Sequence, residues 1–270
     1  MKKTLSIPSS VKGFSLLLLG IIGLACQKVI NVDLNSADPR IVIEGSISDQ
    51  SGPYFVTLSQ TVNFDEANVF PSIRDANIVI SDNLGNSESL IETSPGTYRT
   101  SSMQGVPGRI YTLTVTADGK EYVATSTMPP SVNIDSLTVE NLFIVGNKLK
   151  VIDVHFQDPA NVKNYYRFVE VKNAVVQKFI FLYDDRVQDG RSMSSALFAD
   201  EDTLRTGDSV LVLLQCVDKG VFDYFRTMGQ ASGAEGPQTA SPANPVSNIS
   251  NGALGYFNAY AVRSKRIIIP

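Results

Sequence analysis

The stretch "GRIYTLTVTADGKEYVATSTM", residues 108–128, decides the fold class of the first half of the chain. Tyr111, Leu113 and Val115 alternate with threonines, which is the period of a strand with one buried face. The dipeptide Asp118-Gly119 favours a two-residue hairpin turn, and a second alternating run follows it. The stretch therefore predicts two antiparallel strands joined at that turn.

The sequence upstream of this hairpin repeats the same plan. "RIVIEGSISD", "YFVTLSQTV", "ANIVISD" and "TYRTS" are β-rich runs, and turns rich in Gly, Pro and Asn separate them. About seven short strands at regular spacing are typical of an immunoglobulin-like or transthyretin-like β-sandwich. We predict such a domain over residues 39–128. We place its end at Met128-Pro129-Pro130, because prolines cannot donate to a β-ladder and stiffen a connection.

The second half predicts a larger β-sandwich-like domain over residues 131–270, so the whole chain is expected to be mainly β. Runs such as "KLKVIDVHFQD" and "SVLVLLQCVD" are strands, whereas "SMSSALFADEDTLRTGD" is a polar excursion. The apolar residues of "KGVFDYFRTMGQA" follow i, i+3, i+4, i+7 spacing and predict a short helix near 219–231. A Gly-, Pro- and Ser-rich stretch predicts a long loop over 233–250.

The N-terminus carries a targeting pattern. Three lysines precede the apolar run "LLLLGIIGLACQ", residues 16–27. About a dozen apolar residues are fewer than the roughly 20 of a spanning helix, and small residues end the run. Residues 1–25 therefore predict a cleaved signal peptide. Cys26 directly after it predicts lipidation, as in a bacterial lipobox, and residues 26–38 then form a tether; an ordinary signal peptide with an incidental cysteine is the alternative.

Charge and cysteine content exclude several functions. The formal charge is -4, and removing residues 1–25 removes three lysines and no acidic residue, which leaves -7. An acidic chain argues against nucleic acid as a partner, because nucleic acid requires basic patches. Cys216 lies in the apolar run "VLVLLQCV" and predicts a buried, inert thiol. We expect no cofactor.

Candidate catalytic and metal-binding residues are few. Asp153 and His155, the only histidine, lie on one side of a predicted strand, and Asp158 follows in the next turn. They are weak candidates for a metal site, and we predict no metal there because no second histidine or cysteine pair completes the shell. A serine hydrolase would need a GxSxG elbow, which the sequence lacks. We therefore predict that the protein is not an enzyme.

Two acidic groups offer a second metal hypothesis. They are Asp184-Asp185-Asp189 and Asp200-Glu201-Asp202. Calcium takes six to eight oxygen ligands, often from loops of this kind. Neither group has the spacing of a known calcium loop, so we predict solvated loop charge and keep calcium as the alternative.

An ordered set of motifs resembles a known family. Behind the lipobox cysteine come "IVIEGSISD", "GPYFVTLSQT", "DANIVISDNLGN", "GTYRT", "PGRIYTLTV" and "NPVSNISNGALGYFNAY". In this order they resemble Bacteroidota lipoproteins known as domain of unknown function four-two-four-nine. The resemblance implies an outer-membrane lipoprotein, often linked with TonB-dependent transporters, with no catalytic residues to carry over. It leaves both the periplasmic and the cell-surface face of the membrane open.

The same resemblance suggests two kinds of site. O-glycosylation in that lineage favours Asp, then Ser or Thr, then an aliphatic residue, which points to Thr203 first and to Ser136 and Ser209. Tyr256 and Phe257, after the long loop, are a possible partner surface, and a structural crossover is the alternative.

We therefore expect a lipid-anchored envelope protein that works by binding. Acylated Cys26 would hold it to membrane lipid, and a TonB-dependent transporter or another envelope protein would be its partner. A stand-alone structural or adhesive surface protein is the first alternative. A hydrolase acting on envelope glycans or peptides is the second, and it would depend on Glu44, Asp153 or His155.

Overall fold

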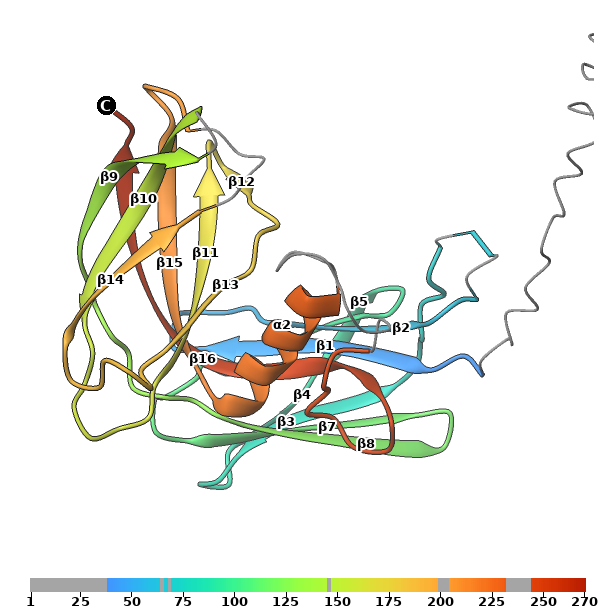
Figure 1. The fold of residues 1–270 in the computed structure, drawn as a ribbon. Helices are drawn as coiled ribbons and strands as arrows, with labels where there is room; N and C mark the ends of the chain where they lie inside the picture. Colours follow the sequence, from blue (N-terminus) through green and yellow to red (C-terminus); the bar gives the residue numbers. More distant parts are fainter. Residues whose placement is uncertain (1–37, 64–65, 68, 145–146, 199–203, 232–243) are drawn as a thin grey trace, which may run out of the picture. The chain divides into compact units, whose positions relative to one another are not determined.

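The computed structural model describes residues 38–270 except 64–65, 68, 145–146, 199–203 and 232–243 (Figure 1). Strands dominate these residues, and one helix, α2 (Lys219–Ala231), accompanies them. The prediction of a mainly β protein is confirmed, and so is the helix, at the bounds that its apolar spacing gave. None of the described helical residues forms a helix long and apolar enough to cross a membrane.

Eight strands form between residue 38 and the Pro129-Pro130 pair in the part of the chain that the structure describes. They are β1 (Ile41–Ser48), β2 (Phe55–Gln60), β3 (Asn77–Asp82), β4 (Ser87–Ser89), β5 (Ile91–Ser94), β6 (Thr97–Arg99), β7 (Ile110–Ala117) and β8 (Lys120–Thr127).

Eight more strands follow the prolines among the described residues. They are β9 (Ile134–Ile144), β10 (Asn147–Gln157), β11 (Tyr165–Lys172), β12 (Val175–Val176), β13 (Phe181–Asp184), β14 (Ser192–Leu197), β15 (Ser209–Val217) and β16 (Leu254–Ile268).

The hairpin that decides the fold forms as expected. Strands β7 and β8 pair in antiparallel fashion, and Ala117 lies opposite Lys120. Asp118 and Gly119 between them both have positive φ, 50° and 72°. Positive φ at both central positions is the requirement of a type I′ turn, whose twist matches that of the flanking strands.

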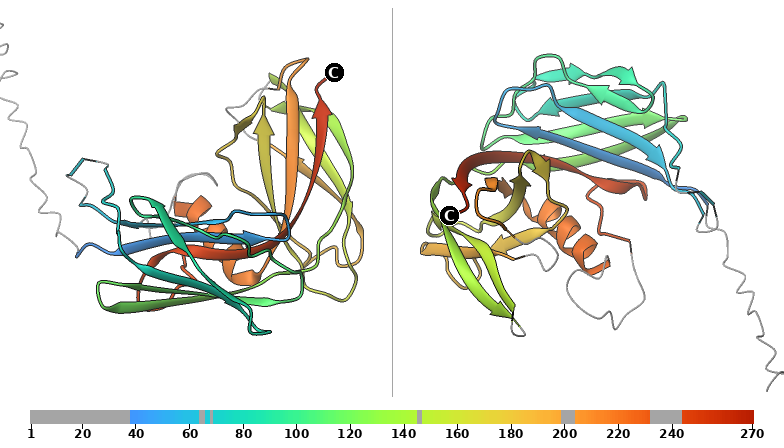
Figure 2. Two further views of the ribbon diagram at one scale, coloured as in Figure 1. Left: turned by 180° about the vertical axis from the view of Figure 1, so that it is seen from behind. Right: turned by 90° about the horizontal axis from the view of Figure 1, so that it is seen from above.

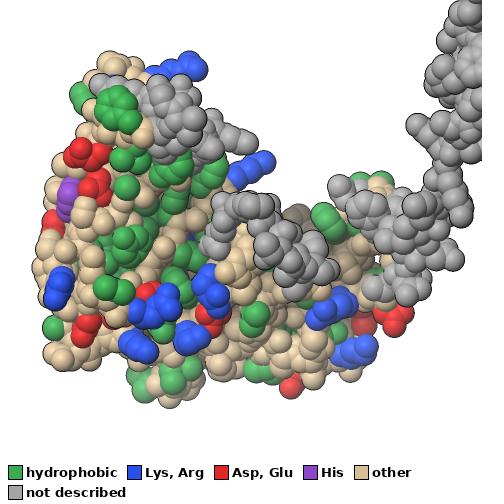
Figure 3. All heavy atoms as spheres, in the orientation of Figure 1, with side chains coloured by type: hydrophobic (Ala, Val, Ile, Leu, Met, Phe, Trp, Pro, Cys, Tyr) green, Lys and Arg blue, Asp and Glu red, His purple; other side chains and the backbone are tan. Residues whose placement is uncertain are grey.

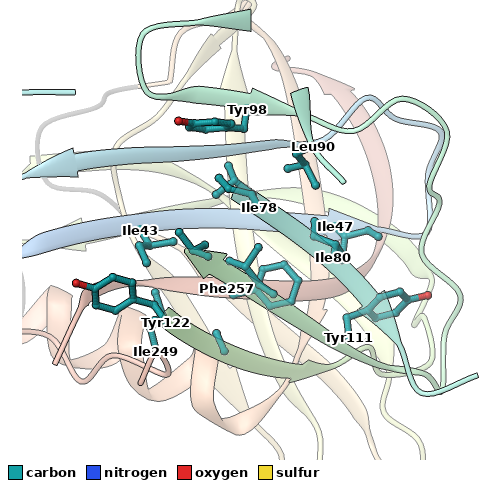
Figure 4. Packing of buried hydrophobic residues seen from close by; sticks show 14 of the residues in the cluster. Ile43, Ile47, Ile78, Ile80, Leu90, Tyr98, Tyr111, Tyr122, Ile249 and Phe257 are labelled. Atoms are coloured by element: carbon teal, nitrogen blue, oxygen red, sulfur yellow. The ribbon is translucent and has the colours of Figure 1, made fainter. Parts of the chain in front are cut away.

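The first core lies between two sheets. The sheet β4-β3-β7-β8 faces the part of the large sheet that holds β16, β1, β2, β6 and β5. Alternate residues of each strand point inward, which is why the burial pattern of β7 repeats every second residue. Figure 4 shows this core, to which Ile43, Ile78, Tyr98, Tyr111 and Phe257 contribute fully buried side chains.

The second core lies between the sheet β14-β10-β9 and the strands β11, β15 and β16. Phe156, Tyr166 and Phe168 are buried there. The ring centroid of Phe156 lies 4.9 Å from that of Tyr166 and 5.9 Å from that of Phe168. Strand β14 falls in the predicted polar excursion. Its pattern alternates like that of any half-buried strand, but a serine, Ser195, occupies one inward position between Met193 and Leu197.

Strand β16 belongs to both cores and changes the predicted domain division. It first runs parallel to β1, from Leu254 opposite Val42, and then antiparallel to β15, as far as Ile268 opposite Ser209 (Figures 1 and 2). Phe257 of β16 therefore packs in the core assigned to residues 39–128, although it lies within 131–270. Ile249, which precedes β16 and bridges to Ala124 of β8, packs there as well. The reason is pairing: β1 has β2 on one side and takes β16 on the other.

Candidate binding site beside helix α2

Helix α2 covers the face of the large sheet that points away from the second core. It packs against β16, β11 and β13. Of the stripe that the sequence spacing indicated, Val221, Tyr224 and Phe225 are buried and Met228 is partly buried, and Phe222 beside the stripe is buried as well. The helix therefore turns one aromatic side to the sheet.

Asp218 fixes the start of α2. Its Oδ1 accepts a hydrogen bond from the backbone N–H of Val221 at 2.9 Å, which is an N-cap interaction. Its Oδ2 accepts from the Ser126 hydroxyl at 2.7 Å and from the Thr127 N–H at 2.9 Å, both at the end of β8. One carboxylate thus caps the helix and ties it to the first sandwich.

Replacing Asp218 by alanine is expected to lower the free energy of unfolding by roughly 2 kcal/mol, because it removes the cap and leaves donors of β8 unpaired. Chemical denaturation measures the change. Asp223→Ala on the same helix is the control, since its ion pairs with Lys219 and Arg226 are at the surface and contribute little. Equal losses in the two variants would contradict the capping role.

The face under α2 is a continuous row of side chains in register. Arg167 on β11 lies opposite Gln215 on β15, which lies opposite Val262 on β16. Opposite residues share a face, and so do residues two apart, so Tyr260 and Tyr256 join the row. Glu44 on β1, opposite Tyr256, completes it.

Arg167 is the charged centre of this row. Its Nη1 donates to the Gln215 Oε1 at 2.8 Å, and its guanidinium carbon lies 4.1 Å from the centroid of the Phe225 ring. Its Nε is buried and has no hydrogen-bond partner among the described residues, and none of their carboxylates forms an ion pair with it. Asn258, also on this face of β16, has a buried Oδ1 without a partner there.

Burial changes the electrostatics of the row. Desolvation lowers the pKa of Arg167, against a smaller opposing influence of Tyr256 and Tyr260, yet arginine stays charged at neutral pH. Desolvation also raises the pKa of Tyr256 and brings that of Tyr224 to about 12, so both hydroxyls are neutral. Arg167 is thus a half-buried cation with neutral phenols around it and one N–H donor, Nε, without a partner among the described residues. Such a cation suits a carboxylate or phosphate group.

The aromatic rings around Arg167 make a preformed wall. Tyr256 lies 4.8 Å from Tyr224 and 4.9 Å from Phe225, measured between ring centroids. Tyr165 lies 5.1 Å from Phe222. Basic and acidic side chains intermingle on the visible surface near the start of α2 (Figure 3), so recognition here depends on local contacts rather than on a field of one sign.

The predicted partner surface at Tyr256 and Phe257 is wrong for Phe257. Phe257 is fully buried in the first core, because neighbouring residues of a strand point to opposite faces. Tyr256 is partly buried and belongs to the row beside Arg167. Sequence reasoning missed Arg167, although its alternation with Tyr166 and Phe168 in "NYYRFVEVKN" already placed it on the face away from the core.

The weak metal candidates do not come together. His155 Nε2 lies 3.8 Å from Asp153 Oδ2 and 2.9 Å from the Thr138 hydroxyl. Asp158 instead groups with Asp185 and is buried. The chain turns after β10 and carries Asp158 off the strand face that Asp153 and His155 share.

The same strands do not form a catalytic triad. Ser194 donates to Asp153 at 2.5 Å rather than to His155. In a triad the serine bonds one imidazole nitrogen and the acid bonds the other, whereas Asp153 and Thr138 both lie near Nε2 of His155.

The remaining predicted sites fall in several places. Cys26, Thr203 and most of the loop 233–250 lie outside the described residues. Ser136 is exposed on β9, and the Ser209 hydroxyl accepts from Arg266 at 2.8 Å. Cys216 is buried as predicted, and desolvation raises the pKa of its thiol to about 12.

These features define a class: a mainly β protein in which two sandwich cores share one long strand and a single described helix covers a cationic, aromatic sheet face. A family model matches residues 27–266, and the chain belongs to that family, DUF4249, a domain of unknown function. No curated protein matches the sequence.

Solved structures with some similarity include three β-rich or uncharacterised proteins. A segment of two fibronectin type III domains from chicken tenascin is 13% identical, covering 67% of this chain and 92% of that one, with a TM-score of 0.22. The chicken interferon gamma receptor alpha chain is 8% identical, covering 87% and 100%, with a TM-score of 0.24. A DUF4785 family protein of Legionella pneumophila is 12% identical, covering 67% and 53%, with a TM-score of 0.26.

Proposed function

We propose that this protein is a lipid-anchored outer-membrane lipoprotein that serves as a binding or accessory module. Its partner is a TonB-dependent transporter or another envelope protein that offers an acidic group to the face beside α2. The observation that carries the proposal is Arg167, a half-buried cation with an unpaired Nε and no ion-pair partner among the described residues.

The energetics of Arg167 favour binding over stability as its role. Taking a guanidinium out of water costs free energy, and a buried charge is normally offset by a carboxylate. Here one hydrogen bond and one aromatic ring offset it within the protein. A carboxylate or phosphate of a partner would supply the missing charge.

The N-terminal pattern supports the anchor. The apolar run before Cys26 is too short to span a bilayer, and several acyl chains on one cysteine exceed what stable attachment requires. The mature protein would then remain on the membrane while residues 26–38 give the folded part reach. Binding beside α2 and anchoring at Cys26 are separable, which makes the proposal testable in two independent ways.

The test is co-purification of tagged full-length protein from crosslinked native membranes, followed by mass spectrometry. We expect a TonB-dependent transporter, or another single envelope protein, in near-equal amount. Cys26→Ser is expected to release the protein from the membrane and separates anchoring from partnership. Recovery of the protein alone would contradict the accessory role and favour a stand-alone surface protein.

Arg167→Met is expected to lower recovery of the partner about tenfold or more, because truncating one member of a buried charge pair is costly. Arg226→Met is the control, since Arg226 lies on α2 itself and is engaged by Asp223 at 3.1 Å. Melting temperatures verify that both variants fold. Undiminished recovery with Arg167→Met would place the partner elsewhere.

A further inference from the structure

Three carboxylates from two separate segments meet beside the strands of the second core. Asp158 follows β10, and Asp185 and Asp189 lie between β13 and β14. One oxygen from each lies within 4.8 Å of the others. Asp158 and Asp185 are 1% and 3% exposed, whereas Asp189 is exposed. No Lys, Arg or His of the described residues forms an ion pair with any of the three.

The surrounding hydrogen bonds hold the carboxylates in place. Asp158 accepts from the Tyr166 hydroxyl at 2.5 Å and from the Gly190 N–H at 2.9 Å. The backbone N–H of Asn164 donates to Asp185 at 2.8 Å, and that of Asn161 donates to Asp189 at 2.9 Å. These neutral donors orient the oxygens, but they do not offset three like charges at this separation.

A fourth oxygen, from Asn164, has no hydrogen-bond partner among the described residues. Asn164 is 5% exposed, and its side-chain Oδ1 is buried without a hydrogen bond among the described residues. Tyr165 pairs with Asp184, so Asn164 lies opposite Asp185 in the next antiparallel position. Opposite residues share a face, and Tyr166, two residues on, reaches Asp158 from that same face. The orphan oxygen therefore lies on the side of the strand where the carboxylates gather.

We propose that Asp158, Asp185, Asp189 and Asn164 bind a calcium ion. Calcium–oxygen distances are about 2.4 Å, so ligand oxygens on opposite sides of one ion are separated by about 4.8 Å, and the three carboxylate oxygens lie within that distance of one another. An all-oxygen set suits a hard cation, whereas zinc prefers imidazole or thiolate. Exposed Asp189 gives the ion an entry path and leaves room for water to complete the shell. The proposal is independent of the binding role of Arg167.

The first experiment uses the unmodified full chain. We expect its melting temperature to rise by roughly 5 °C or more between excess EGTA and millimolar CaCl₂, since binding to the folded state alone stabilises it. We also expect terbium luminescence on excitation of tyrosine, because the chain has no tryptophan and Tyr166 bonds a ligand carboxylate. CaCl₂ should quench this luminescence. An unchanged melting temperature, or an equal rise with MgCl₂, would overturn the proposal.

Asp185→Asn is expected to abolish the calcium-dependent rise and to lower terbium luminescence at least tenfold. Asp184→Asn is the matched control, because Asp184 neighbours it in sequence and pairs with Arg186 at the surface. The control should keep both responses. Asn164→Ala keeps all three carboxylates and should weaken calcium binding severalfold, so the proposal does not rest on a variant that removes charge. Full responses in both Asp185→Asn and Asn164→Ala would overturn the assignment.

Discussion

Gly255→Ala is expected to lower the free energy of unfolding by at least about 4 kcal/mol. Gly255 has φ +95°, a conformation that residues with a side chain rarely adopt. A Cβ there would overlap the carbonyl oxygen of Ile43 and lie 2.8 Å from its carbonyl carbon. That atom is backbone of the paired strand β1, so relief requires β1 and β16 to separate. Urea denaturation, with yield of soluble protein as a second readout, measures the effect.

Gly85→Ala separates the two causes of this loss. Gly85 has nearly the same φ, +89°, but a Cβ there would meet nothing within 4 Å. Its loss therefore reports backbone strain alone, about 1–3 kcal/mol. The excess in Gly255→Ala then reports the close approach of the two strands. If the two variants lost the same stability, the parallel pairing of β1 with β16 would be wrong.

Phe257→Ala is expected to cost about 3–5 kcal/mol, the usual range for a buried aromatic residue replaced by alanine. Phe257 is fully buried in the first core, where it faces Gly45 across the β1–β16 pair. Gly45 has no side chain that could move into the resulting cavity, and a Cβ built there would lie 3.4 Å from the Phe257 ring. The midpoint of urea denaturation at pH 7 measures the change.

Phe143→Ala is the matched control for Phe257→Ala. Phe143 is 76% exposed, and substitutions at exposed positions are usually within about 0.5 kcal/mol of neutral. A variant Phe257→Ala that kept its stability but lost a partner protein would restore the idea of a partner surface at this residue. We expect the opposite: loss of stability with any loss of binding secondary to it.

Local patterns predicted the parts of the fold that local forces decide. The hairpin at Asp118-Gly119 requires positive φ that this dipeptide tolerates. The helix 219–231 follows from the spacing of four apolar residues, and Asp218 caps it. Strand β14 was not predicted, because serine at an inward position weakens the alternation of apolar and polar residues that defines a strand.

Neither the binding site around Arg167 nor the carboxylate cluster was predicted from the sequence, and the reason is different. Arg167 alternates with core aromatics, and alternation alone assigns it to solvent; only the docking of α2 makes that face half-buried. Asp158 lies nearly thirty residues before Asp185, so their meeting depends on the antiparallel pairing of β11 with β13. Pairing between distant segments leaves no local signature, and the same holds for β1 and β16.

The order of synthesis gives β16 a further consequence. Every other described strand precedes it in the chain, and both hydrophobic cores need its residues. Domains near an N-terminus commonly fold while the rest of the chain is still being made. Here the nascent first half has neither the parallel neighbour of β1 nor Phe257, and the second half lacks the neighbour of β15. We therefore expect both cores to be completed only after β16 has been made.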